Sequence, residues 1–142
     1  MMHSRDTLDA LHKVRAINRV IAERYPEQPL FQTLRECDAR HVTALLHLFS
    51  LMDWPLPEDR WVGTTFSGNY SALVTQSLQA EADCVRAYDR VLASTSDSTV
   101  RTVVGNLRKT SLDVRLPALE KSDAAPSALP PGIGEAMGSA RP

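Results

Sequence analysis

Four amphipathic stretches of similar length follow one another along the chain and account for most of its body. Apolar residues recur every three or four positions in each, as Val14, Ile17 and Ile21 do in the first. This spacing places apolar side chains on one face of a helix. Alternation with a period of two, which is typical of strands, is absent. The four stretches cover residues 7–25, 30–52, 69–93 and 99–119.

Helices of about 20 residues, each about 30 Å long, can pack side by side along their whole length. The sequence therefore predicts an all-α protein, an up-down four-helix bundle with a long connection between its second and third helices. That connection, residues 53–68, holds Trp54 and Trp61 and is expected to fold back over the body. It can act as a crossover that makes the third helix parallel to the second.

Short polar residues and prolines set the expected helix ends. Asp6 or Thr7 is a suitable N-cap for the first helix. Pro26 and Pro29 are expected to end that helix, because proline lacks the backbone donor and restricts the residue before it. Pro117 is expected to kink or end the fourth helix in the same way.

Length and composition limit the organisation to one domain. The chain has 142 residues, 6 Gly and 9 Pro, and seven of those glycines and prolines lie in residues 121–142. Such a segment cannot bury enough apolar surface to offset its ordering entropy. We expect residues 1–6 to be a flexible N-terminus, residues 7–120 to form the bundle, and residues 121–142 to be a disordered tail.

The charge pattern argues against several kinds of partner. The net charge is −1 with both signs interspersed, so a basic nucleic-acid footprint is not expected. No run of 18 apolar residues is present, and the first residues lack the apolar core of a signal peptide. These features predict no membrane span and a cytoplasmic location. Cys37 and Cys84 are then expected to be buried thiols and not a disulfide.

Polar residues interrupt the apolar faces of the second and third helices. Asp38 and His41 stand three positions apart between Leu34 and Leu45, so they point the same way and can hold one metal ion from one helix. On the third helix, Glu81 lies on the apolar face, and Tyr88 follows two turns later. A buried carboxylate requires a cation, a hydrogen-bond donor or a raised pKa.

A purely structural interpretation stands beside the metal hypothesis. Asp38 and His41 can hydrogen-bond to each other, and Glu81 can pair with Arg15 or Arg115. His12 and His47 lie off the apolar faces and are expected on the surface, and His3 belongs to the N-terminus. A thiolate pair of Cys37 with His41 is disfavoured, because a reactive thiolate needs an exposed electropositive setting and this stretch is apolar.

Several segments together resemble small bacterial ferritin-like proteins of the rubrerythrin type. The run Leu34 to Leu46, with its Arg40-His41 pair before an apolar run, looks like their second helix, and Trp54 to Asp59 is similar to the link that follows. The third and fourth helices of that family are similar to the segments that hold Ala80-Glu81-Ala82, Ala87 to Leu92, Leu107-Arg108 and Leu116 to Leu119.

The resemblance implies a bundle that holds two iron or manganese ions. Asp38 and His41 match one of the family's acid-x-x-His pairs, and Glu81 matches one lone carboxylate. The glutamate of the family's first helix falls on Leu11, and the histidine of its fourth helix falls on Arg115. An arginine there would neutralise Asp38 or Glu81 without metal, so the resemblance implies a degenerate di-metal site.

Two classes of function remain open, and whether the chain is an enzyme is left undecided. The first is a non-catalytic structural or protein-interaction module. It is favoured because a complete di-metal site needs about six side-chain ligands and only three can be placed in this sequence. The second is an iron- or manganese-binding protein or oxidoreductase that uses Asp38, His41 and Glu81, with Tyr88 as a donor beside the metal. By analogy with the family, a homodimer is expected. An unidentified protein partner is compatible with both classes of function.

Overall fold

The computed structural model describes residues 2–124, and over that range its secondary structure consists of helices joined by irregular connections. One π-helical turn interrupts the last long helix. The elements are α1 (Met2–Arg24), α2 (Pro29–Leu51), α3 (Tyr70–Ser94), α4 (Ser98–Thr110), the π turn (Ser111–Arg115) and α5 (Leu116–Ala124).

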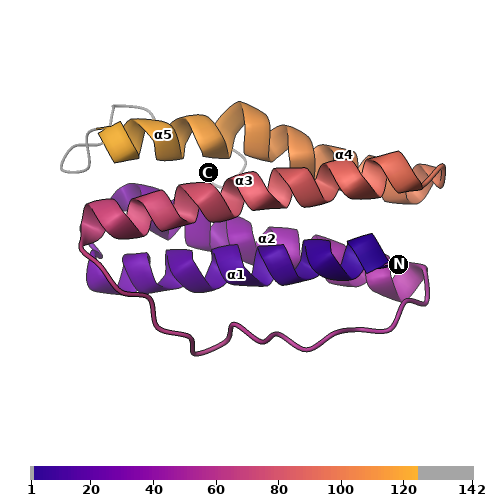
Figure 1. The fold of residues 1–142 in the computed structure, drawn as a ribbon, viewed down its shortest axis with the longest axis horizontal. Helices are drawn as coiled ribbons and strands as arrows, with labels where there is room; N and C mark the ends of the chain where they lie inside the picture. The colour runs from indigo at the N-terminus through magenta and orange to yellow at the C-terminus, as the bar shows by residue number, and fades with distance from the viewer. Residues whose placement is uncertain (1, 125–142) are drawn as a thin grey trace.

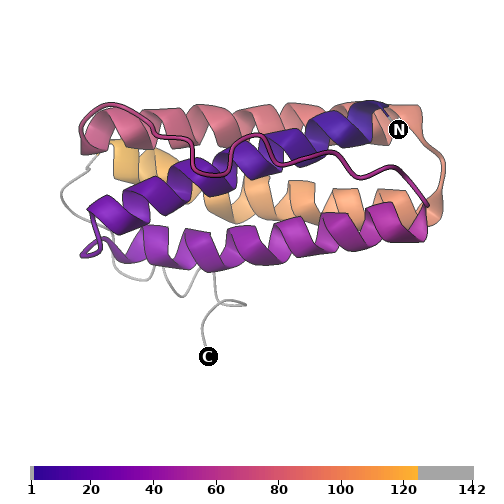
Figure 2. The ribbon, with the colours of Figure 1, turned by 90° about the horizontal axis from the view of Figure 1, so that it is seen from below.

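Together α4, the π turn and α5 make one long rod that completes a four-helix bundle with α1, α2 and α3 (Figure 1). The long connection after α2 returns along the outside of the bundle to the end where α2 began (Figure 2). As a result, α2 and α3 run in the same direction, which is the crossover expected from the length of this connection. None of the helices within residues 2–124 is long and apolar enough to cross a membrane.

The core is made of the apolar faces that the periodicity predicts. Val14, Ile17 and Ile21 of α1 are fully buried, and α1 contacts both α2 and α3 extensively. The residues of the bundle centre with less than 2% exposure include Phe31, Leu34, Leu45, Leu48, Phe49, Leu73 and Tyr88. Both cysteines are buried and free, as expected.

The first helix begins earlier than the sequence predicts. Residues 2–6 belong to α1, and Ser4 is buried, so the expected flexible N-terminus is wrong for these residues. Asp6 and Thr7 are not N-caps, because they lie inside the helix; the Thr7 hydroxyl donates to the His3 carbonyl one turn back at 2.8 Å. Asn69 and Asp97 are the side-chain caps of α3 and α4, accepting from Ala72 and Val100 backbone N–H groups.

Pro117 does not end the fourth helix. The π turn Ser111–Arg115 precedes it, and the Leu116 N–H bonds to the Ser111 carbonyl, five residues back. A wider turn at this point accommodates a proline that has no N–H for the ordinary helical bond. The helix then continues to Ala124, four residues beyond the predicted end of the body, and residues 125–142 of the expected tail lie outside the described range.

Candidate functional site

Arg115 lies fully buried at the centre of the bundle and contacts both carboxylates that the sequence singles out. Its side chain is 1% exposed. The Nη2 atom donates to Asp38 Oδ1 at 2.5 Å and lies 3.0 Å from Glu81 Oε1, while Nε also donates to that Glu81 oxygen at 3.0 Å. Of the two pairings left open for Glu81, the one with Arg115 is therefore confirmed, and Arg15 pairs with Asp59 instead.

Neutral side chains complete the hydrogen bonding of the two carboxylates. The Asn18 amide donates to Asp38 Oδ2 at 2.9 Å, and the Ser77 hydroxyl donates to the Asn18 carbonyl oxygen at 2.6 Å. On the other side, the Ser111 hydroxyl donates to Glu81 Oε2 at 2.6 Å. All four carboxylate oxygens of the cluster therefore accept from a protein donor.

The cluster connects every helix of the bundle. Asn18 comes from α1, Asp38 from α2, Glu81 from α3, and Ser111 with Arg115 from the π turn. Ser111 and Arg115 are both buried, so the turn supplies two adjacent donors to the core. A π turn changes which side chains of a helix face inward. Here the turn places the Arg115 side chain where its guanidinium contacts both Asp38 and Glu81.

Burial and the charges of neighbouring groups have opposing effects on the pKa values of Asp38 and Arg115. Burial raises the pKa of Asp38, against the opposing effects of the Arg115 charge and the Asn18 hydrogen bond. For Arg115, burial by itself lowers the pKa, but the negative charges of Asp38 and Glu81 outweigh it and hold that pKa well above its ordinary value. Arg115 is thus a permanent cation facing two acids.

His41 does not join Asp38 in the cluster. Its ring Nε2 lies 3.4 Å from the Cys37 sulfur, and the histidine is only partly buried. Burial, with the nearby Arg115 charge, lowers the pKa of His41 to about 4. The imidazole is therefore neutral near pH 7, whereas a thiolate pair would require it as an imidazolium cation.

Tyr88 is fully buried, and its hydroxyl has no hydrogen-bond partner in the described part of the chain. Burial and the neighbouring Cys84 and Glu81 raise its pKa well above the ordinary value for tyrosine, so it stays protonated. Arg115 Nη1 is the other buried polar atom of the cluster without a partner among residues 2–124.

The residues present do not fit the di-metal centre that the resemblance implies. Within residues 2–124 no group of three or more His, Cys, Asp or Glu side chains is arranged to hold a metal ion. The space between Asp38 and Glu81 is taken by the Arg115 guanidinium, and Leu11, at the position of the first-helix ligand, is a core residue. A cation that does not lose its proton thus stands where the resemblance would place a metal ion.

The positions of the other three histidines agree only in part with the sequence prediction. His47 is exposed, as predicted, and His3 is half-buried within α1. His12 is not a surface residue: it is 5% exposed, and its Nδ1 lies 3.8 Å from Asp59 Oδ1 in the connection. The connection covers this part of α1, which the apolar pattern of α1 alone could not indicate.

Three residues of the cluster went unrecognised as site residues in the sequence. Asn18 and Ser77 occupy core-facing positions of α1 and α3, one helical repeat from Val14 and Val74. Ser111 stands on the predicted apolar face of the fourth stretch. A polar residue at a core-facing position is the signal that identifies such residues in the sequence.

Comparisons with known proteins add no assignment. No protein-family model, no curated protein and no solved structure matches this chain.

Proposed function

We propose that this chain is a ferritin-like helical bundle that acts as a non-catalytic structural or protein-interaction module, with an arginine-centred ion cluster in place of a di-metal centre. The observation that carries the proposal is the contact of Arg115 Nη2 with both Asp38 and Glu81, at 2.5 and 3.0 Å. The return of the connection along the bundle supports the ferritin-like arrangement (Figure 2).

In this proposal the ion cluster selects one helix packing among several. A buried ion pair is often no more stable than well-packed apolar residues, but leaving one member unpaired is costly. Asp38 and Glu81 reach Arg115 from different helices, so a shift of either helix would strand a buried charge. The cluster thereby fixes the position of the π turn against α2 and α3.

The module would then act through its surface. Leu51, Leu56 and Val62 are large apolar side chains with 59%, 64% and 73% exposure, at the end of α2 and in the connection. Exposed apolar residues of this kind serve self-association or a protein partner when they gather on one face. Light scattering of the parent and of Leu56→Ser tests the homodimer: a dimer that the substitution dissociates supports it, and a parent monomer at all concentrations contradicts it.

The alternative is a metal-binding protein or oxidoreductase in which Asp38, His41 and Glu81 bind iron or manganese. One observation favours it: Asp38 and Glu81 both approach a single nitrogen atom, so their carboxylates already converge from two helices. Such convergence is what a metal site requires of its acidic ligands.

Elemental analysis separates the two proposals. Protein is purified from cells supplemented with iron and manganese, beside Asp38→Ala/His41→Ala and the matched control Asp89→Ala/His47→Ala, whose residues are exposed. The structural proposal predicts metal at well below one ion per chain, unchanged by either double substitution. About one ion per chain or more, lost in the first double variant and kept in the control, would establish the metal-binding alternative.

A further inference from the structure

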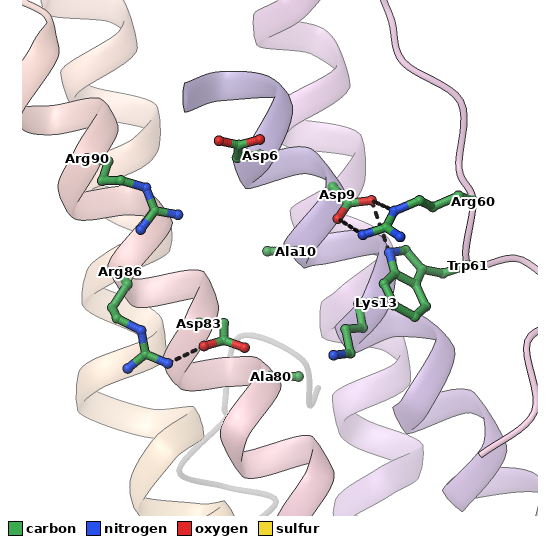
Figure 3. A pocket seen from close by; sticks show the side chains of 10 residues that line it. All are labelled: Asp6, Asp9, Ala10, Lys13, Arg60, Trp61, Ala80, Asp83, Arg86 and Arg90. Carbon is green, nitrogen blue, oxygen red and sulfur yellow. Dashed lines mark hydrogen bonds and ion pairs between the residues drawn. The ribbon is translucent and has the colours of Figure 1, made fainter. Parts of the chain in front are cut away.

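Residues 59–61 of the connection, called the strap below, are fastened to α1 by polar contacts at two places. Arg60 donates to both oxygens of Asp9 at 2.7 and 2.9 Å, and the Trp61 indole N–H donates to Asp9 Oδ1 at 3.0 Å (Figure 3). Further along α1, Arg15 donates to Asp59 Oδ2 at 2.7 Å. Specific contacts therefore hold the strap against the stretch of α1 between Asp9 and Arg15.

His12 lies on that stretch of α1 and is covered by the strap. Its side chain is 5% exposed, and Nδ1 is buried without a hydrogen-bond partner among residues 2–124. Nδ1 lies 3.8 Å from Asp59 Oδ1, which is too long for a hydrogen bond. Both Asp59 oxygens already accept bonds, from Arg15 and from the Trp61 backbone N–H. An imidazolium carries N–H on both nitrogens, so its Nδ1–H would be buried here without an acceptor at bonding distance.

The charges around His12 do not compensate for this burial. Burial has the largest effect and lowers the pKa of His12. The carboxylates of Asp59 and Asp9 raise that pKa and the Arg15 charge lowers it, so the net result lies below the ordinary value of about 6.5. Arg60 neutralises Asp9. Within residues 2–124, no charged group of α2 or α3 contributes to the shift.

We propose that the strap is an acid-released device, in which uptake of a proton by His12 frees residues 59–61 from α1. A buried imidazolium loses its hydration, and lifting the strap returns that hydration. Release also exposes Trp61 and Asp9, so acid changes the surface that the protein offers to a partner. The inference goes beyond the proposed module, because it uses no residue of the Arg115 cluster.

The direction of the effect follows from the two protonation equilibria. Above about pH 6.5, His12 is neutral in both forms and the strap stays closed. As the pH falls below that value, the released form takes up the proton more readily than the closed form does. The equilibrium constant for release should then rise by up to about tenfold per pH unit, until the pH reaches the His12 pKa of the closed form.

Hydrogen exchange of the Trp61 indole N–H measures this equilibrium, because the indole proton is bonded to Asp9 only while the strap is closed. The exchange rate is divided by that of free tryptophan at the same pH, and Trp54→Phe identifies the signal among the two tryptophans. We expect release to increase several-fold from pH 7 to 5. The backbone amide of the core residue Leu45 reports global unfolding and should exchange much more slowly.

Two variants show whether His12 is responsible. His12→Gln keeps a neutral polar side chain, so its release should be independent of pH over this range. His47→Gln removes an exposed histidine of α2 and should keep the parental pH dependence. Circular dichroism confirms that each variant is folded. An NMR titration of His12 in the unmodified protein needs no variant and should give a pKa below 6.5.

Four results would each overturn the proposal. The first is release that stays constant between pH 7 and 5. The second is release that decreases on acidification, which would mean that the imidazolium fastens the strap through Asp59. The third is an undiminished pH dependence in His12→Gln. The last is exchange of Trp61 at the rate of Leu45, since the strap would then open only when the whole bundle unfolds.

Discussion

Replacing Arg115 by methionine tests the energetics of the buried cluster. The substitution removes the guanidinium but keeps an unbranched apolar stem, and it leaves Asp38 and Glu81 facing each other without a cation. Removing one partner of a buried ion pair costs about 3–5 kcal/mol. Since Arg115 serves two carboxylates, we expect a loss of about 4 kcal/mol, a large share of the roughly 5–15 kcal/mol typical of a domain.

Urea unfolding followed by circular dichroism measures this loss. Arg108→Met is the matched control, because Arg108 pairs with Asp89 at 2.6 Å on the surface, with 39% and 51% exposure of the two side chains. An exposed pair contributes less than about 1 kcal/mol. The two arginine substitutions should therefore differ in unfolding free energy by about 3 kcal/mol.

A compensating variant separates the lost charge balance from lost packing. Arg115→Met/Asp38→Asn/Glu81→Gln removes all three charges and should recover at least about 2 kcal/mol relative to Arg115→Met alone. The stabilising role of the Arg115 cluster is refuted if Arg115→Met costs no more unfolding free energy than Arg108→Met. It is also refuted if the triple variant is no more stable than the single one.

Three further predictions concern single groups. Burial lowers the pKa of His41 to about 4, so between pH 6.5 and 4 only the unfolded chain binds a proton at His41. Acidification from pH 7 to 5 should therefore lower the unfolding free energy by about 2 kcal/mol. This loss should be absent in His41→Gln. An equal pH dependence in both proteins would contradict this. Ser111→Ala strands a buried oxygen of Glu81 and should cost about 1–3 kcal/mol in urea unfolding; an unchanged midpoint would be inconsistent with the 2.6 Å bond. Asp9→Asn loosens the connection and should speed tryptic cleavage after Arg60 with little change in the unfolding midpoint; cleavage at the parental rate would show that the contact does not hold this segment.

Helical periodicity predicted the four-helix body because each helix buries one continuous apolar face. Val14, Ile17 and Ile21 are buried as their spacing indicated. The start of α1 is earlier than expected because Asp6 or Thr7 suits an N-cap and residues 1–6 carry little apolar pattern, whereas the burial of Ser4 and Thr7 depends on neighbouring segments. Pro117 was expected to kink or end the helix, and a π turn, which no local pattern announces, accommodates it without ending the helix.

The residues of the candidate site could be predicted where a charged residue interrupts the apolar face of a helix. Asp38, Glu81 and Arg115 stand out in the sequence, and the structure brings these three together. His41 shares a helix with Asp38, but its ring contacts the sulfur of Cys37, one helical turn earlier, and does not join the cluster. The roles of Asn18 and Ser111 depend on which helices lie opposite them, and the sequence does not state that arrangement.

In the proposed ferritin-like bundle, Arg115 holds the position that a metal ion would otherwise take between Asp38 and Glu81. Heteronuclear NMR with one equivalent of Mn²⁺ tests it most directly, because a bound paramagnetic ion broadens signals near it. We expect a slowly exchanging signal from Arg115 Nε–H, which donates to Glu81, and this signal should stay sharp with one equivalent of Mn²⁺. Selective broadening of the Asp38, Glu81 and Arg115 signals, reversed by a chelator, would contradict it.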